Sequence, residues 1–342
     1  LFCISYLTIS LRGKLITDQF FDPLRTTDIR DEVRIVGIDD SSLQSLGAWP
    51  WDRSIFGDLT RSLYDLGAKE VIYDVLFLEK RSGDDYFKKS LSDSKIPIIL
   101  PSKNYNGTYL KSFLNEGNSN VFNALAQVTP DIDGKVRLYP RPYVVDNKCI
   151  STLSQSAFDI YMHKEFTCNN SDFLFRYPPT IKTISVKDVL DGNITNNFFK
   201  NKVVFIGSTS LDLEDHFIGM NGEKIAGVYV HASVFTSLLN SVKDMRIDDT
   251  YTILLLIIYS VVFTLVMYRA KRLITQMSVV SGFIITVIII TLISFSFGII
   301  IPFPWLILAT ILNGGYISGF KFIKERKQNE YISSLFSKYV HK

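Results

Sequence analysis

The sequence contains few of the residues that metal sites and nucleotide-dependent enzymes need. Its 342 residues include three cysteines and four histidines, and the absence of Cys-x-x-Cys and His-x-x-x-His spacings argues against a zinc site. Walker loops, Gly-x-Gly-x-x-Gly, Gly-x-Ser-x-Gly and zinc-protease helices are also missing. The net charge of +3 is too small to favour nucleic acid as a partner. We therefore expect no metal, no cofactor and no catalytic residue in this chain.

Charge is nearly absent from the last third of the sequence. Residues 251–322 are apolar apart from one basic cluster, and three segments approach the length of about 20 apolar residues that crosses a bilayer. A buried helix of a soluble protein explains any one of them, but not three in succession with very short connections. We predict membrane helices at 250–269, 275–297 and 302–322, surrounded by lipid.

The basic residues indicate how these helices are oriented. Lys and Arg concentrate on the cytoplasmic side of membrane proteins, and here they follow the first helix, at 269–272, and the third, at 321–327. The connection at 298–304 carries no charge. We therefore expect a multi-pass protein of the plasma (inner) membrane, with residues 15–245 extracytoplasmic and the C-terminus in the cytoplasm.

The first residues are apolar but too few to span a membrane. They lack an initiating Met and a basic flank, and Arg12 follows them. We interpret residues 1–14 as the end of a first transmembrane helix, and the alternative is the remnant of a signal peptide.

Two of the cysteines lie in the predicted extracytoplasmic domain. Cys149 and Cys168 can form a disulfide there, because disulfides persist outside the cytoplasm. The alternative is that Cys149 simply packs, since it lies next to the strand-like run at 143–145. Both alternatives remain open at the level of sequence.

The domain at 15–245 alternates between the hydrophobic periods of strands and helices. Strand-like runs at 33–38, 70–77 and 96–100 are separated by helical patterns, and another strand-like run lies at 202–206. This β-α-β-α-β order predicts an α/β domain with a mixed, largely parallel sheet and flanking helices.

The middle of this domain, 107–188, has a less regular pattern. Antiparallel hairpins are expected there, and Asp131-Ile132-Asp133-Gly134 is typical of a hairpin turn. Asp131 and Asp133 lack the further ligands and the terminal Glu of a calcium loop.

Polar and aromatic side chains gather around the predicted strand ends. Ligands of open α/β sheets bind beyond the carboxyl ends of the strands, and the strands that end near Asp39 and Asp74 are expected to be neighbours. One interpretation is that a pocket for a small ligand or cation is built from these groups. Its candidate residues are Asp39, Asp40, Trp49, Trp51, Arg53, Asp74, Gly207, Ser208 and His231.

A purely structural explanation of the same residues remains open. Aspartates after strands often cap helices, and Arg53 can form a buried pair with one of the carboxylates and hold the Trp49–Trp51 loop. The two tryptophans then pack on the core or meet the membrane surface. His231, alone near a helix start, has a satisfied structural role in this interpretation.

Several of these residues belong to a recognisable pattern. Its first pieces are Ile38-Asp39-Asp40, Leu46-Gly47, Trp49-Pro50-Trp51-Asp52-Arg53, and Gly67-Ala68-Lys69 leading to Asp74 and Phe77. Its later pieces are Asp133-Gly134-Lys135-Val136-Arg137, the run at 203–209, Asp215 and the run at 227–232. Over about residues 20–242 the pattern resembles the second type of CHASE domain, an extracellular sensor associated with bacterial cyclases, histidine kinases and serine/threonine kinases. The resemblance implies an extracellular or periplasmic signal, although Ser233 stands where it leads us to expect Asn.

The tail at 323–342 predicts a cytoplasmic linker helix toward an output domain. Phe336-Ser337-Lys338-Tyr339-Val340 resembles the run that precedes class III nucleotide cyclase domains, and Ile332, Phe336 and Tyr339 form an apolar stripe suited to a homodimer. The resemblance implies a membrane adenylate cyclase in cAMP signalling, with Mg or Mn and ATP at the missing cyclase domain. The alternatives are a histidine or serine/threonine kinase output, or an extracytoplasmic enzyme or binding domain.

Overall fold

The computed structural model describes residues 14–115, 117–145, 147–166, 168, 173–195, 197–213 and 215–340. The chain divides into two compact units, which are described separately. The α/β unit is Asp22–Lys243, and the helical unit is Leu1–Phe21 with Asp244–Lys342. The transmembrane end expected at 1–14 lies outside the described residues except for Lys14, which begins a helical stretch at 14–21.

The α/β unit is built on a mostly parallel sheet, as predicted. Six strands pair in parallel in the order β5-β3-β2-β10-β1-β9, and β4 extends β3 in the antiparallel direction. The strands are β1 (Val33–Ile38), β2 (Glu70–Asp74), β3 (Ile98–Tyr105), β4 (Thr108–Leu110), β5 (Val121–Leu125), β9 (Thr183–Ser185) and β10 (Val203–Ser208).

The late strand β10 lies between β1 and β2, so the expectation that these two strands are neighbours is wrong. All six residues of β10 are buried. A strand that is apolar on both faces is stabilised in the middle of a sheet, where helices cover both sides. This position lets β10 complete the centre of the sheet.

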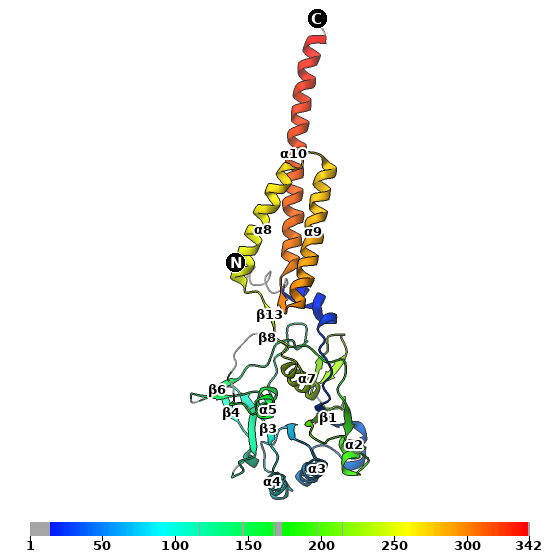
Figure 1. Cartoon of the computed structure of the whole chain (residues 1–342), viewed down its shortest axis with the longest axis vertical. Coiled ribbons are helices and arrows are strands. Elements are labelled where there is room, and N and C mark those ends of the chain that lie inside the picture. Colours follow the sequence, from blue (N-terminus) through cyan, green and yellow to red (C-terminus); the bar gives the residue numbers. More distant parts are fainter. Residues whose placement is uncertain are drawn as a thin grey trace. The chain divides into compact units, whose positions relative to one another are not determined.

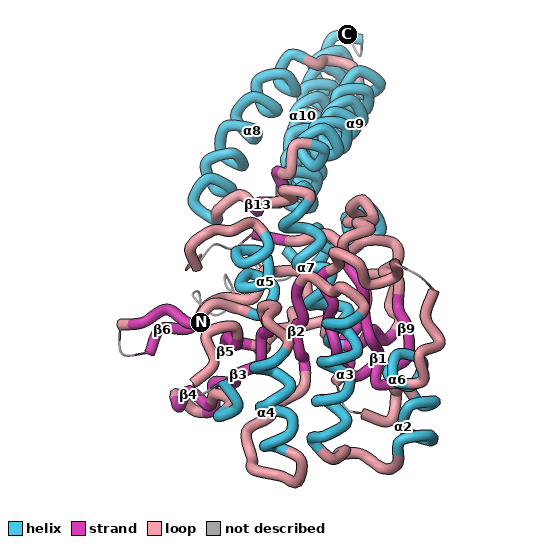
Figure 2. Tube along the Cα trace, turned by 60° about the horizontal axis from the view of Figure 1, so that its bottom comes forward, coloured by secondary structure: helices cyan, strands magenta, loops and turns pink. Residues whose placement is uncertain are grey.

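Helices cover both faces of the sheet (Figure 2). On one face, Val36, Val71 and Ile206 pack against residues such as Phe56 and Phe87. The helices of this face are α2 (Asp40–Leu46), α3 (Arg53–Asp65), α4 (Asp84–Asp93) and α6 (Val186–Leu190).

The alternate residues of the same strands point to the other face. There Ile35, Ile72 and Phe205 pack against Ala157 of α5 (Leu153–Tyr161) and Phe235 of α7 (Gly227–Leu239). The alternation is the period of two expected of strands, and it makes the unit a three-layer α/β/α sandwich.

The less regular middle of the chain contains one of the expected antiparallel hairpins, β6 (Tyr143–Val145) with β7 (Lys148–Ile150). Another antiparallel hairpin, β11 (His216–Ile218) with β12 (Lys224–Ala226), lies outside this region and precedes α7. The turn at Asp131 is present, with Gly134 N donating to Asp131 O at 2.9 Å. It does not join two strands of a hairpin, because Lys135 instead forms an isolated parallel bridge with Ile218. The remaining short elements of the unit are the 3-10 turns Asp22–Leu24 and Phe113–Asn115 and the strand β8 (Phe173–Leu174).

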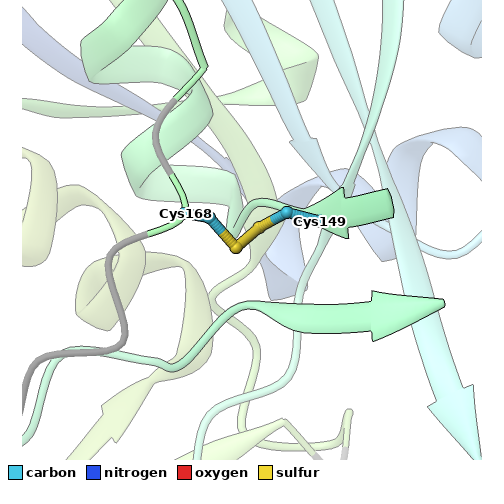
Figure 3. Close-up of a disulfide and its surroundings, with 2 residues drawn as sticks. All are labelled: Cys149 and Cys168. Carbon is cyan, nitrogen blue, oxygen red and sulfur yellow. A yellow bond between two sulfur atoms is a disulfide. The ribbon is translucent and has the colours of Figure 1, made fainter. Parts of the chain in front are cut away.

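Cys149 and Cys168 form a disulfide, so the first of the two alternatives for this pair is the one observed (Figure 3). Their Cα atoms are 5.9 Å apart. The bond connects β7 to the segment that follows α5, and it closes a loop that contains the whole of α5.

The helical unit contains the three predicted long apolar helices, α8 (Asp249–Arg269), α9 (Leu273–Ser296) and α10 (Phe303–Val340), and each is long and apolar enough to cross a membrane. In Figure 1, α8 and α9 pack along the first half of α10. The short strands β13 (Asp244–Arg246) and β14 (Ile299–Ile300) pair in parallel at one end of the bundle. The predicted span at 302–322 and linker helix at 323–342 are one unbroken helix through Val340.

Close packing holds the bundle together. A Cβ atom on Gly314 of α10 would come within 3.0 Å of Val280 Cγ2 in α9, so a larger residue there would press the two helices slightly apart. Phe263 of α8 stacks edge-on against Phe283 of α9, with ring centroids 5.0 Å apart. Lys321 of α10 donates hydrogen bonds to the carbonyl oxygens of Met267, Tyr268 and Ala270, which satisfies the C-terminal end of α8.

Candidate functional site

The carboxyl ends of three central strands lie side by side. Ile38 of β1 pairs with Ser208 of β10, and Gly207 of β10 pairs with Asp74 of β2. A pocket of about 510 Å³ opens at this edge, which is where ligands bind in parallel α/β sheets. Its lining residues are Ile38, Trp49, Asp74, Val75, Leu76, Ser102, Lys103, Ala126, Gln127, Val128, Ser208, Leu213, Asp215 and Phe217.

Asp39 does not line this pocket. Its side chain caps α2 by accepting a hydrogen bond from Ser42 N at 2.9 Å, and it also accepts from the hydroxyls of Ser41, Ser42 and Ser185. Burial disfavours the charged form of Asp39, but these hydrogen bonds outweigh it and lower its pKa. Asp40 accepts a hydrogen bond from Ser210 Oγ. Both carboxylates therefore have structural partners, as the alternative interpretation predicted.

The predicted pairing of Arg53 with one of the strand-end aspartates is wrong. Its guanidinium Nε lies 3.7 Å from Asp84 at the start of α4, and its Cζ lies 4.5 Å from the ring centroid of Phe77. Asp84 competes successfully because it lies in the first turn of α4, which packs against the start of α3. Arg53 thus joins two helices of one layer and does not reach the pocket.

The two tryptophans have different environments. Trp51 is buried in the core, and its Nε1 donates to Gly47 O at 2.8 Å. Trp49 packs edge-on against Trp51, with ring centroids 5.4 Å apart, and it lines the pocket. Only Trp49 is placed to contact a ligand in the pocket.

Gly207 and Ser208 contribute backbone and a hydroxyl to this edge. A Cβ atom on Gly207 would come within 2.7 Å of Val228 Cβ and 3.1 Å of Asp74 Cβ. The glycine therefore lets the start of α7 pack directly on β10 beside Asp74. Ser208 lines the pocket.

Asp74 and His231 are brought together beneath the pocket. His231 Nε2 lies 3.7 Å from Asp74 Oδ1, and both side chains are at least nine-tenths buried. Asp74 Oδ2 is buried and has no hydrogen-bond partner within the part of the chain that the structure describes. Burial raises the pKa of Asp74 to about 7, and burial lowers the pKa of His231 to about 4, opposed by the nearby Asp215. Near pH 6 the pair is therefore neutral, with a protonated carboxyl beside an uncharged imidazole.

Asp215 also belongs to the site, but it cannot be predicted from the tendency of ligands to bind at the carboxyl ends of parallel strands. A Cβ atom on Gly227 would come within 2.6 Å of its Oδ1, so the carboxylate lies against the first residue of α7. Burial and the proximity of Asp74 raise the pKa of Asp215 to about 6, while His231 and His216 oppose the shift. Asp215 follows no strand, so only its place in the resemblance to a CHASE domain singled it out in the sequence.

Lys103 and Gln127 are two further residues of the pocket that were missed. Lys103 lies near the end of β3, and Gln127 comes two residues after β5. Ligands of parallel sheets also bind beyond the ends of strands such as β3 and β5. The hydrophobic pattern of the sequence did not identify β5, so Gln127 was not predicted.

The constellation that an extracytoplasmic enzyme would need is not assembled. Only His231 and Asp74 of the four candidate groups lie together, while Asp39 and Asp40 bind serine hydroxyls. Among the described residues, no group of three or more His, Cys, Asp or Glu side chains is placed to hold a metal ion.

The raised pKa of Asp74 predicts a pH-dependent stability. The folded protein retains a proton on Asp74 up to about pH 7, whereas an unfolded aspartate loses it near pH 4. The stabilising contribution of this proton is complete below about pH 4 and is lost as the pH rises to 7. An Asp74→Asn variant has no such proton. As the pH rises from about 5 to about 7.5, the free energy of unfolding of wild type should therefore fall by about 2 kcal/mol relative to that of the variant.

This difference is measured by urea unfolding of both proteins across that pH range. His231 has the opposite dependence, because its folded pKa is lowered and its contribution is lost as the pH falls from about 6.5 to 4. The contribution of His231 is present in both wild type and Asp74→Asn, so it largely cancels when their free energies of unfolding are compared. A difference that stays constant with pH would contradict the assignment of a retained proton to Asp74.

A comparison with protein families identifies the chain. A family model described as the CHASE2 domain matches residues 2–267, which is most of the chain, and the chain therefore belongs to the CHASE2 family. No curated protein and no solved structure matches it. The chain is thus a CHASE2 sensor domain with three candidate membrane spans, an arrangement that suggests a multi-pass membrane protein.

Proposed function

We propose that this CHASE2 protein is the sensor and membrane part of a bacterial receptor, in which an extracytoplasmic signal controls a cytoplasmic output domain. The observation that carries the proposal is α10, which continues from an apolar membrane span into a polar helix without a break. A continuous helix can transmit a rotation or shift from the membrane to whatever follows it.

The proposed orientation is supported by charge and by the disulfide. Basic residues lie at the connection of α8 and α9 and after the span of α10, which favours the cytoplasmic side for both. The disulfide between Cys149 and Cys168 suits an oxidising compartment for the α/β unit. The α/β unit is therefore extracytoplasmic in this proposal, and the end of α10 is cytoplasmic.

The proposed output is a class III nucleotide cyclase that makes cAMP from ATP with Mg or Mn. Its support is the resemblance of 336–340 to the run before such domains. The exposed apolar side chains Ile332 and Phe336 are one helical turn apart on α10 and suit pairing with a second copy of the chain. A homodimer fits this output because the two halves of a class III active site come from two chains.

The experiment is a fusion of a class III cyclase catalytic domain after Lys342, assayed for cAMP in cells. Insertion of one alanine between Gln328 and Asn329 rotates the following helix by about 100°, whereas seven added residues restore its direction to within about 20°. We expect the single insertion to change cAMP production several-fold and the seven-residue insertion to restore it.

Two results would overturn this proposal. Equal cAMP from both insertions would mean that the direction of α10 carries no signal. Absence of cAMP from the uninserted fusion, although the same catalytic domain is active when it is dimerised by an unrelated coiled coil, would place the end of α10 outside the cytoplasm or its dimer out of register. A natural output of the kinase class would appear as ATP-dependent phosphorylation without cAMP in membranes that hold the natural gene product.

A further inference from the structure

We infer that the pocket at the carboxyl ends of β1, β2 and β10 binds a small organic ammonium ion, and that Asp74 and Asp215 supply its counter-charge. The inference deepens the proposed sensor function, because it names the chemical class of signal that this pocket would take. It rests on the geometry of the pocket, on an unpartnered buried carboxyl oxygen and on the balance of charge in the site.

The first observation is an oxygen atom without a partner. Asp74 Oδ2 is buried and accepts no hydrogen bond from the part of the chain that the structure describes, and His231 Nε2 lies 3.7 Å from Asp74 Oδ1. A buried carboxyl group that lacks partners costs free energy unless it is protonated or finds a donor. Asp74 lines the pocket, so a ligand bound there can supply that donor.

The second observation is a deficit of positive charge around the pocket. Among the described residues, the ionisable groups at this site include Asp74 on β2, Asp215 before β11, His231 on α7 and Lys103 on β3. His216, the next residue in the chain and the first of β11, also acts on Asp215. His231 is uncharged near neutral pH because burial lowers its pKa to about 4. Lys103 is the one basic side chain among the described residues of the lining, so two carboxyl groups share at most one cation.

The third observation is the character of the walls, which favours an organic cation over a metal ion. Most of the lining is apolar, and Trp49 and Phe217 offer aromatic rings on which an alkylammonium group can stack. No group of three metal-ligating side chains occurs among the described residues. A volume of about 510 Å³ is large for a bare ion and suits a small molecule.

Binding of such a cation is linked to protons. An ammonium group stabilises the ionised form of both carboxyl groups, so binding at pH 6 displaces the proton that Asp74 otherwise retains. The affinity for the cation therefore rises as the pH rises toward 7.5, because removing the proton from Asp74 then costs less free energy. A neutral ligand of the same shape lacks this linkage.

The test uses the full chain in lipid nanodiscs, with n-butylammonium as the probe and n-butanol as its neutral counterpart. Binding is followed by isothermal titration calorimetry and by tryptophan fluorescence, since Trp49 lines the pocket. We expect butylammonium to bind about tenfold more tightly than butanol, and its affinity to increase about tenfold between about pH 5.5 and pH 7.5.

Variants identify the groups responsible. Asp74→Asn keeps the shape and removes the charge, and it should lower the affinity for butylammonium about tenfold and flatten the pH dependence. Asp215→Asn should weaken binding in the same direction. Asp65→Asn is the matched control, because Asp65 is exposed near the end of α3 and does not line the pocket. It should bind as wild type does.

The inference is overturned if butylammonium and butanol bind equally, if neither binds, or if Asp74→Asn and Asp215→Asn both bind butylammonium as tightly as Asp65→Asn does. Should Asp74→Asn fail to fold, the comparison of the two probes on wild type and on Asp215→Asn still decides. These outcomes are independent of the cyclase fusion. If butylammonium does not bind but the one-residue insertion still changes cAMP production, only the ammonium site is wrong. If butylammonium binds but the insertions have no effect on cAMP production, only the proposed signalling through α10 is wrong.

Discussion

Replacing Arg137 by methionine is expected to lower the free energy of unfolding of the α/β unit by about 3–5 kcal/mol, because it breaks a buried ion network by removing one partner. The Arg137 side chain is completely buried. It donates to both oxygens of Asp22 at 2.8 Å and to Asp133 and Asp131 at 2.7 and 2.8 Å. Burial disfavours the guanidinium charge, but the three carboxylates outweigh it and raise the pKa of Arg137.

The network explains why the substitution has a large effect. Asp22 begins the α/β unit, whereas Asp131 and Asp133 form the turn more than a hundred residues later, so Arg137 ties the first residue of the unit to its middle. Without the guanidinium, the cations that buried Asp22 retains among the described residues are Lys135 at 2.8 Å and Arg25 at 3.8 Å. Asp131 and Asp133 of the turn then lose their link through Arg137 to Asp22 at the start of the unit.

The measurement is urea unfolding of the full chain in detergent, followed by near-ultraviolet circular dichroism. Arg137→Lys keeps a positive charge but lacks the planar guanidinium that binds three carboxylates. Its urea midpoint of unfolding should lie between those of wild type and Arg137→Met. Arg326→Met is the control, because the pair of Arg326 with Glu330 is 71% and 63% exposed and should contribute less than about 1 kcal/mol. Equal midpoints for Arg137→Met and Arg326→Met would contradict the stabilising role of the network.

The layers of the fold could be predicted from the sequence, but the order of its strands could not. Hydrophobic period identified β1, β2 and the start of β3 because each buries a local run of residues. The position of β10 between β1 and β2 depends on pairings with residues 170 and 133 positions earlier in the chain, such as Val33 with Val203 and Glu70 with Val203. No local pattern contains that information, so a prediction from the sequence that pairs consecutive strands places β1 beside β2.

The candidate site shows the same division between local and long-range information. Asp39 and Asp74 look equivalent in the sequence, since each stands at the end of a strand. Asp39 meets the hydroxyl of Ser185, which lies 146 residues away, whereas Asp74 meets His231 and has one oxygen to which no described residue donates a hydrogen bond. The difference between a structural and a candidate binding carboxylate thus arises from tertiary contacts, and it decides which of the two faces the pocket.

Loss of the disulfide between Cys149 and Cys168 is expected to lower the free energy of unfolding of the α/β unit by up to about 3 kcal/mol. The bond joins residues 19 positions apart, and closing a loop of this size removes about 3 kcal/mol of chain entropy from the unfolded state. The loop contains α5, whose Leu153 and Ala157 pack in the core against the sheet. Because this packing also constrains the loop in the folded state, reduction should weaken the unit without unfolding it.

The Cys149→Ser/Cys168→Ser double variant and wild type treated with dithiothreitol should unfold at the same, lower urea concentration. Dithiothreitol should not move the midpoint of the double variant further, and a Cys3→Ser variant should behave as wild type does. The pairing also tests the compartment, since protein made in a reducing cytoplasm should react with maleimide at both cysteines, whereas exported protein should not. Identical unfolding midpoints for oxidised and reduced wild type would mean that the packing of α5 alone holds this part of the unit, and the disulfide would then have no stabilising role.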